Sequence, residues 1–503
     1  MELVSIILLM TIVGVYLVWF WLLVGKLKGP KTWPLVGSIP QMLLNIRRIH
    51  EWTTDQLLAG PTLGTYQTCG VYIPFLQNWR RSFCTVTCHP ENLEHILHTK
   101  FHNYPKGPTW QNTLGDVLGN QEWISQRKIV VPELTKSKLG PSLHHWVNPS
   151  IKNDLLPILD EASKHNISID LQKLMICFGS NCTAMDTIFE FAFRRFFYPN
   201  FLWKFMRFFC IGSEGSLKKS IQILNNTITE AQEERNNRKK DETFDDDLLW
   251  AFMKKVQVNG HILPSSAIMG TILDILLAGR DSVATSASWF FWLVMNNPRV
   301  EEKIVHEIIT VLKKTRGEDM GGSKLPCGEE TQEWMKDPLT YEEVNSLVYL
   351  HATLLETLRL YPAVPKIVRY AICDDILPDG TYVPAGSDII LSLYSVGRMK
   401  SVWGEDCLKF KPERWLSTDE KRIERHEDGY KFAAFNGGSR ICIAKYLTYL
   451  EMKSVASAIL LRYELSHVPG HQVTSKLSFT ISMMNGLKVN LKRRDLSDFD
   501  VIN

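Results

Sequence analysis

One cysteine near the end of the chain stands in a setting that suits a metal ligand. Cys442 lies in FAAFNGGSRICIAK, residues 432–445, between a glycine turn and an apolar helix-like run. A thiolate is a strong, electron-rich ligand, and Gly438 lets backbone N–H groups point at the sulfur while the helix dipole favours the anion. Arg440 is placed to meet an anionic substituent of the same bound group, and Phe435 to shield the sulfur. The other interpretation is a buried cysteine acting as a small hydrophobic side chain.

Further residues could form ion pairs or bind anions. Glu356 and Arg359, in LLETLRLYP, stand three residues apart, so a carboxylate and a guanidinium can meet on one helix face. Arg414 follows in FKPERW, and Trp123 and Arg127 lie one helical turn apart in EWISQRK. An ordinary surface ion pair is the alternative for the first two residues.

An acid and a hydroxyl interrupt a long apolar run. The segment LLAGRDSVATSASWFFWL places Ala278 and Gly279 just before Asp281 and Ser282. Because a buried carboxylate is costly unless it has a function, this pair is a candidate for proton transfer.

These elements, in this order, resemble the cytochrome P-450 family of haem-thiolate monooxygenases along nearly the whole chain. The cysteine loop fits the family pattern F-x-x-G-x-R-x-C-x-G and departs at Ala444, where the family has Gly. The resemblance implies haem b (iron protoporphyrin IX) as the cofactor, with Cys442 as the ligand of its iron. It implies structural roles for Glu356, Arg359 and Arg414. The cofactor-binding residues that it implies are Trp123, Arg127 and Arg369 at the haem propionates, together with Ala278, Gly279, Phe435, Gly438, Arg440 and Ala444.

The same resemblance makes Asp281 and Ser282 the catalytic pair, which passes protons while O2 is reduced. The family usually has Thr in the place of Ser282, and a second Thr is common in the place of Val283. A serine hydroxyl can relay protons, but without the methyl group of threonine it has more rotamers. Efficient coupling of O2 use to product formation is therefore a hypothesis.

Several strings, such as HNYPKGP and WGEDCLKFKPERW, resemble the plant group of this family that hydroxylates fatty acids and long alkanes. The expected reaction is hydroxylation of an apolar small molecule, a fatty acid or long-chain alkane, with O2. The alternatives are oxidation or phenol coupling of a specialised metabolite (an alkaloid or a hormone conjugate), an isomerase or dehydratase on the same fold, and a non-enzymatic haem carrier.

The expected electron donor is a separate NADPH–cytochrome P-450 reductase. The chain has no G-x-G-x-x-G nucleotide motif in a strand–helix context, so NADPH is not expected to bind here. Lys128, Lys445 and Lys453 could attract an acidic flavoprotein on the cysteine face, or they could be ordinary solvated lysines.

The first residues predict a membrane anchor. Residues 3–24 carry no charged side chain, and a helix of this length spans roughly 33 Å. Lys26, Lys28 and Lys31 follow it, which keeps the body on the cytosolic side and favours a single-pass protein of the endoplasmic reticulum membrane over a cleaved signal peptide. The predicted organisation is an anchor at 1–25, a proline-rich hinge at 26–40 and one haem-binding domain at 41–503.

The body is predicted to be mainly α with a small β portion. Helix-like periodicity dominates from Glu91 to about Leu360, and a last long helix is expected from Tyr446 to about Arg462. Strand-like alternation occurs in five short stretches. They are residues 64–67, 84–87 and 381–393, LSFTISM and GLKVNLK.

Composition excludes several other classes of protein. The 503 residues carry a formal net charge of +3, which is too small to indicate a nucleic-acid partner. Ten cysteines without regular spacing do not make a disulfide framework. CTVTCHP, with Cys84, Cys88 and His89, could be half of a zinc site, but a strand with buried thiols is the preferred interpretation.

Overall fold

The computed structural model describes most of the chain, which forms two compact units. Unit 1 comprises Met1–Trp110, Val364–Lys409 and His426–Ile441, and unit 2 comprises Gln111–Ala363, Phe410–Arg425 and Cys442–Asn503. The described residues are 2–25, 27–59, 64–70, 79–118, 127, 131–134, 140, 143–179, 183–196, 198, 200–237, 265–316, 337–424 and 430–496.

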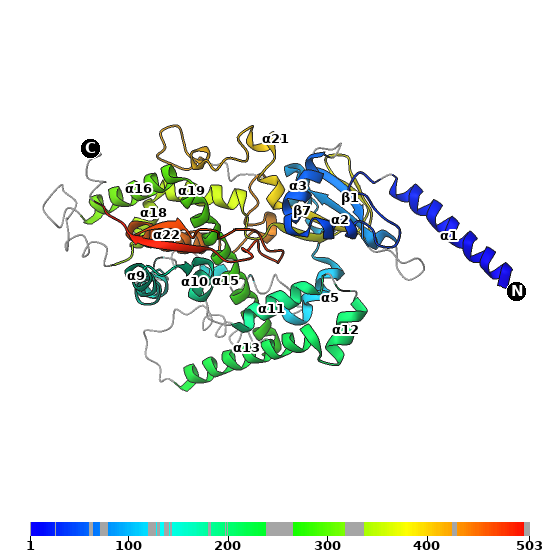
Figure 1. Ribbon diagram of the computed structural model, residues 1–503, viewed down its shortest axis with the longest axis horizontal. Coiled ribbons are helices and arrows are strands. Elements are labelled where there is room, and N and C mark those ends of the chain that lie inside the picture. The colour runs from blue at the N-terminus through cyan, green and yellow to red at the C-terminus, as the bar shows by residue number, and fades with distance from the viewer. Residues whose placement is uncertain are drawn as a thin grey trace. The chain divides into compact units, whose positions relative to one another are not determined.

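Unit 1 begins with a long apolar helix, α1 (Glu2–Val24), drawn in blue in Figure 1. Its stretch Val4–Leu22 is long and apolar enough to cross a membrane, and most of its side chains are exposed. The expected apolar helix is therefore confirmed. After it the chain is irregular until α2 (Ile39–Leu44), where Pro40 occupies the first turn. The proline ring is tolerated there because the N–H groups of the first turn have no partner within the helix.

A four-stranded sheet forms the centre of unit 1. Its strand order is β1 (Thr65–Cys69), β2 (Phe83–Thr87), β7 (Asp388–Ser392) and β4 (Lys366–Tyr370), with only the β2–β7 pair parallel. The strand-like stretches at 64–67, 84–87 and 381–393 are thus confirmed, the last as β6 (Tyr382–Val383) and β7. The other unit 1 elements are α3 (Ile49–Ala59), α4 (Pro90–Glu94), β5 (Asp375–Ile376), α20 (Leu393–Val396) and α21 (Lys400–Trp403).

Unit 2 is mostly helical, as expected. Its longest described helix is α15 (Ser265–Met295), whose Trp289 ring stacks 3.8 Å from Tyr361. Helix α22 (Lys445–Arg462) confirms the predicted last helix and packs against α15, α16 and α19. The remaining helices are α8 (Asn148–Ser150), α9 (Leu156–Lys164), α10 (Leu171–Gly179), α11 (Thr183–Arg194), α12 (Asn200–Phe208), α13 (Gly212–Asn237), α16 (Pro298–Arg316), α18 (Tyr341–Ser346) and α19 (Val348–Leu360), while α5 (Gly107–Leu118) crosses the boundary between the units in sequence.

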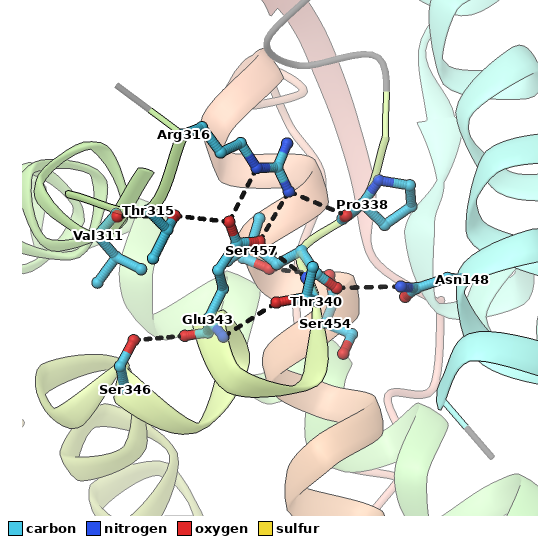
Figure 2. A network of polar contacts seen from close by, with 11 residues as sticks. Asn148, Val311, Thr315, Arg316, Pro338, Thr340, Glu343, Ser346, Ser454 and Ser457 are labelled. Atoms are coloured by element: carbon cyan, nitrogen blue, oxygen red, sulfur yellow. Dashed lines mark hydrogen bonds and ion pairs between the residues drawn. The ribbon is translucent and has the colours of Figure 1, made fainter. Parts of the chain in front are cut away.

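Helix ends in unit 2 are fixed by polar contacts that the sequence encodes. Thr340 caps α18 by accepting a hydrogen bond from the N–H of Glu343, whose carboxylate accepts one from the N–H of Thr340. Figure 2 shows Arg316, at the end of α16, donating two hydrogen bonds of 2.8 and 2.7 Å to the same carboxylate. Burial alone would raise the pKa of Glu343. The hydrogen bonds from Arg316, Thr315 and the N–H of Thr340, together with the Arg316 charge, outweigh the burial, and the pKa is lowered.

Unit 2 contains a three-stranded sheet with strand order β3 (Ile169–Asp170), β9 (Lys488–Arg493) and β8 (Tyr463–His467). The prediction for GLKVNLK is confirmed by β9. The prediction for LSFTISM is wrong, because residues 477–483 form bends with one isolated bridge. The backbone groups of Ile481 bond elsewhere: its N–H donates to Ala363 O at 2.9 Å, and its C=O accepts from Trp289 Nε1 at 2.6 Å.

Candidate functional site

The turn before Cys442 requires glycine. Gly438 has φ +58°, and a Cβ placed on it would lie 2.1 Å from the carbonyl oxygen of Leu97. No side chain fits at that distance, and the left-handed conformation disfavours any other L-residue. The sequence FNGGSR therefore folds into a turn that only Gly at this position permits.

Cys442 itself is half-buried and lies just before α22, whose N-cap is Ala444. Burial raises the pKa of its thiol, while a backbone hydrogen bond from Ala444 and the charges of Arg127 and Lys445 oppose the rise. The burial outweighs these groups, so the protein alone favours the protonated thiol. A metal ion that displaces the thiol proton would complete the ionisation.

Glu356 and Arg359 meet inside unit 2, as the spacing predicted. Both side chains are 0% exposed, and Arg359 donates two hydrogen bonds of 2.8 Å to the carboxylate. Arg414 Nε and Trp415 Nε1 donate to the same carboxylate at 3.0 and 2.9 Å. A surface ion pair, the alternative interpretation, is excluded by this burial.

Asp281 and Ser282 lie in the middle of α15. The Asp281 side chain is 18% exposed, and burial raises its pKa to about 6, although the neighbouring Arg280 charge opposes the rise. The Ser282 hydroxyl donates to the carbonyl of Ala278 at 2.5 Å. An acid with this pKa holds and releases a proton near neutral pH, which is what a proton-transfer group needs.

The segment around Arg369, in unit 1, contains an unsatisfied buried cation. Arg369 is 3% exposed, and among the described residues its Nε has no hydrogen-bond partner. Burial and, to a smaller extent, the charge of Arg440 together lower its pKa to about 9. Arg440 also lies over the ring of Phe101, 5.4 Å from its centroid. Two guanidinium groups that influence each other in this way would both be stabilised by an anion.

The model of the family described as Cytochrome P-450 matches residues 72–493 of the chain. The chain belongs to the cytochrome P-450 family. It is 35% identical to cytochrome P-450 86B1 from Arabidopsis thaliana, over 94% of this chain and 88% of that protein. It is 33% identical to alkane hydroxylase MAH1 from the same plant, over 92% and 93%. Noroxomaritidine synthase 2 from Narcissus aff. pseudonarcissus is 29% identical, over 93% and 92%.

Members of the cytochrome P-450 family bind haem iron and are monooxygenases, so the chain is an oxidoreductase of this kind. The resemblance to plant members of the family that the motifs indicated is confirmed. Each unit offers a group of the kind that haem needs. Unit 2 has the Cys442 thiol, and unit 1 has the buried Arg369, whose Nε has no hydrogen-bond partner among the described residues. A Cβ placed on Gly279 would have no described atom within 4 Å, and Ala278 beside it is exposed, so no described side chain packs against this turn of α15.

The structure tests only some of the remaining residues that the sequence singled out, namely one tryptophan and three lysines. Trp123 and Lys128 lie outside the described residues. Lys445 is half-buried. The expectation that Lys453 could attract a redox partner from solvent is wrong, because its side chain is buried in α22 and burial lowers its pKa to about 8.

The zinc alternative gains no support. Cys84 lies in β2 and Cys88 is fully buried, and burial raises the pKa of both thiols, so the interpretation as a strand with buried thiols is confirmed. In the described part of the chain, no three or more His, Cys, Asp or Glu side chains group as metal ligands.

One residue was missed by the sequence reasoning. Arg280, next to Asp281, is 2% exposed and donates a hydrogen bond of 2.6 Å to Asp186 on α11. A cation beside an acid within an apolar helix was a visible signal, but its partner lies 94 residues away in the sequence.

Proposed function

We propose that the protein is a haem-thiolate monooxygenase that hydroxylates an apolar small molecule, with O2 and electrons from an NADPH–cytochrome P-450 reductase. The observation that carries this proposal is Cys442, held between a turn that requires Gly438 and the start of α22, in a chain of this family. Haem b is the proposed cofactor. When bound, it supplies the activation of O2 that the side chains of the protein cannot supply.

In this proposal the residues divide into those that hold haem and those that serve the reaction. Cys442 ligates the iron, and Arg440, Arg369 and Arg127 bind the anionic edge of the ring together with Trp123. Phe435, Gly438, Ala444, Ala278 and Gly279 shape the space for the ring. Glu356, Arg359 and Arg414 fix the polypeptide around it.

Asp281 and Ser282 serve proton transfer. With a pKa raised to about 6 by burial, the Asp281 carboxyl can take a proton from water and release it toward the reaction. The Ser282 hydroxyl donates to Ala278 O at 2.5 Å. To relay a proton, it would turn this hydrogen toward the reacting O2, release it there and take a replacement from the Asp281 carboxyl. This need for proton delivery favours an O2-using enzyme over an isomerase, a dehydratase or a passive haem carrier.

Ser282→Ala tests the relay. The variant is expected to make several-fold less product per NADPH consumed, because proton delivery falls and O2 is reduced to peroxide. Ser286→Ala is the matched control, since Ser286 lies one turn later and only donates to the carbonyl of Ser282 at 2.8 Å. Equal coupling in both variants and in the wild type would contradict the relay.

A fatty acid or long-chain alkane is the substrate that we propose. Full-length similarity to a protein named an alkane hydroxylase supports it. The second candidate is a specialised metabolite that undergoes oxidation or phenol coupling, which the similarity to noroxomaritidine synthase 2 supports. Spin-shift titrations with fatty acids, alkanes and phenolic amines separate the two, because only a molecule that binds beside the haem would change the absorption spectrum of the haem.

We propose that α1 anchors the protein in the endoplasmic reticulum membrane with the body in the cytosol. The length and apolar character of Val4–Leu22 support the anchor, and Lys28 and Lys31, which follow the helix, support the cytosolic orientation. The predicted division at residues 25 and 40 belongs to this proposal. Protease protection in microsomes tests it, because a lumenal body would be protected.

The central experiment is a reduced carbon-monoxide difference spectrum of the purified protein. We expect the Soret band of a thiolate-ligated haem, which Cys442→Ser abolishes and Cys373→Ser, at an exposed cysteine, leaves unchanged. Protein that carries no porphyrin, or a Cys442→Ser variant with the wild-type Soret band and turnover, would refute the proposal.

A further inference from the structure

The Arg280 side chain in α15 is buried but only partly satisfied. Its Nη2 donates to Asp186 Oδ1 on α11 at 2.6 Å. Its Nη1 lies 3.4 Å from Asp281 Oδ1, within ion-pair range, yet neither of these two atoms makes a hydrogen bond among the described residues. A guanidinium is most stable when a carboxylate binds two of its N–H groups at once, and here Nη1 and Nε have no such partner.

Two carboxylates therefore compete for one cation. Asp186 holds it by a short hydrogen bond although 59% of its own side chain is exposed, whereas Asp281 is only 18% exposed. Because Asp281 is the less solvated acid, an Arg280 released by Asp186 would gain most by closing onto Asp281. That closure would fix Asp281 as a carboxylate in a buried ion pair.

We propose that Asp186 is a positioning residue for proton delivery, which keeps the Arg280 guanidinium from closing its 3.4 Å approach to Asp281 into a hydrogen bond and so leaves Asp281 able to carry a proton. This inference rests on the proposed role of Asp281 in the monooxygenase reaction. The inference also connects α11 to proton delivery. Any movement of α11 that breaks the Asp186–Arg280 hydrogen bond would free Arg280 to form an ion pair with the ionised Asp281 carboxylate.

The charges around Asp281 agree with this arrangement. Burial raises its pKa to about 6, the Arg280 charge opposes the rise, the Asp186 charge adds to it, and Lys476 in the C-terminal segment opposes it more weakly. Lys476 itself lies 3.6 Å from Glu190, one turn after Asp186 on α11. Glu190 also pairs with Arg194. The charges of this group are therefore those of Arg280, Lys476 and Arg194 on one side and those of Asp186, Glu190 and, when ionised, Asp281 on the other.

The test is Asp186→Asn, with Glu190→Gln as the matched control. Both variants remove one negative charge from the same helix, but only Asp186 binds Arg280. The probe is the protonated-carboxyl stretch of Asp281 in infrared titrations of 13C-aspartate-labelled protein, assigned by its absence in Asp281→Asn. In Asp186→Asn we expect the titration midpoint to fall by roughly one unit or more, because a cation that closes on a carboxylate favours its ionised form. In Glu190→Gln we expect a smaller change.

Turnover supplies a second readout. Each unit of fall in the midpoint makes the protonated acid roughly tenfold rarer at neutral pH, so product per NADPH in Asp186→Asn should drop, and its dependence on pH should move toward lower pH. Asp186→Glu, which keeps a carboxylate for Arg280, should restore both measurements. An unchanged Asp281 midpoint in Asp186→Asn, or an equal fall in Glu190→Gln, overturns the inference. The infrared titration does not need haem or substrate, so its result stands apart from any failure of the proposed reaction.

Discussion

Arg359 binds Glu356 through two hydrogen bonds of 2.8 Å, and neither side chain reaches solvent. The same carboxylate also accepts hydrogen bonds from Arg414, from Trp415 and from the backbone N–H of Lys411. One buried acid thus joins α19 to the segment at 411–415, and its removal would leave Arg359 buried without its anion.

Glu356→Ala should therefore destabilise the protein strongly. Breaking a buried ion pair by removing one partner typically costs about 3–5 kcal/mol, and urea unfolding followed by circular dichroism measures it. Arg194→Gln is the control, because Arg194 forms an exposed pair with Glu190 that is worth less than about 1 kcal/mol. If the two variants lost equal stability, Glu356 would not be the centre of this part of unit 2.

Gly438→Ala should prevent the cysteine loop from closing. Its Cβ would lie 2.1 Å from Leu97 O, in addition to the cost of φ +58°, so the expected result is folded protein with little bound haem. Gly470→Ala separates the two effects, because Gly470 has φ +78° but no atom within 4 Å of the added Cβ. This control should lose only about 1–2 kcal/mol and keep its haem. Normal haem content in Gly438→Ala would show that the loop tolerates a side chain.

The elements that the sequence predicted well are those with local causes. Gly438 and Cys442 stand four residues apart, and Glu356 and Arg359 lie one turn apart on one helix, so spacing alone indicates their relationship. The strand expected in LSFTISM failed because the backbone of Ile481 bonds to Ala363 and Trp289, which are distant in sequence. Periodicity does not report such partners.

The burial and the distant partners of charged residues could not be predicted from local sequence either. The position of Lys453, eight residues after the start of α22, gave no indication that packing would bury it. Arg280 was overlooked because a buried cation is recognisable only with its partner, and Asp186 comes from another helix. Local pattern therefore found the cysteine loop, while the electrostatics around Asp281 needed the tertiary structure.

The stability of the protein should report the pKa of Asp281. Because burial raises this pKa from 3.8 to about 6, the folded state holds the proton more tightly than the unfolded state. The stability that this proton contributes is present at acid pH, is lost as the pH rises from about 4 to 6, and is absent above that range. Compared with Asp281→Asn, which lacks the titration, the wild type should lose stability across this window. Urea unfolding at a series of pH values measures the difference, and parallel pH profiles would contradict a raised pKa.

Arg369→Met should stabilise the haem-free protein but weaken its hold on haem. Burial lowers the pKa of Arg369 to about 9, so at neutral pH the charged form is held at a cost, and its Nε has no hydrogen-bond partner among the described residues. Methionine fills similar space without a charge, and we therefore expect the haem-free protein to become more stable.

If Arg369 binds an anionic edge of haem, the same variant should release haem faster to a competing acceptor protein. Arg80→Met is the control, because Arg80 is well exposed and pairs with Asp374, so neither measurement should change by more than a small fraction. A variant that loses stability without haem, or that keeps haem as firmly as the wild type, would show that Arg369 serves the fold instead of the cofactor.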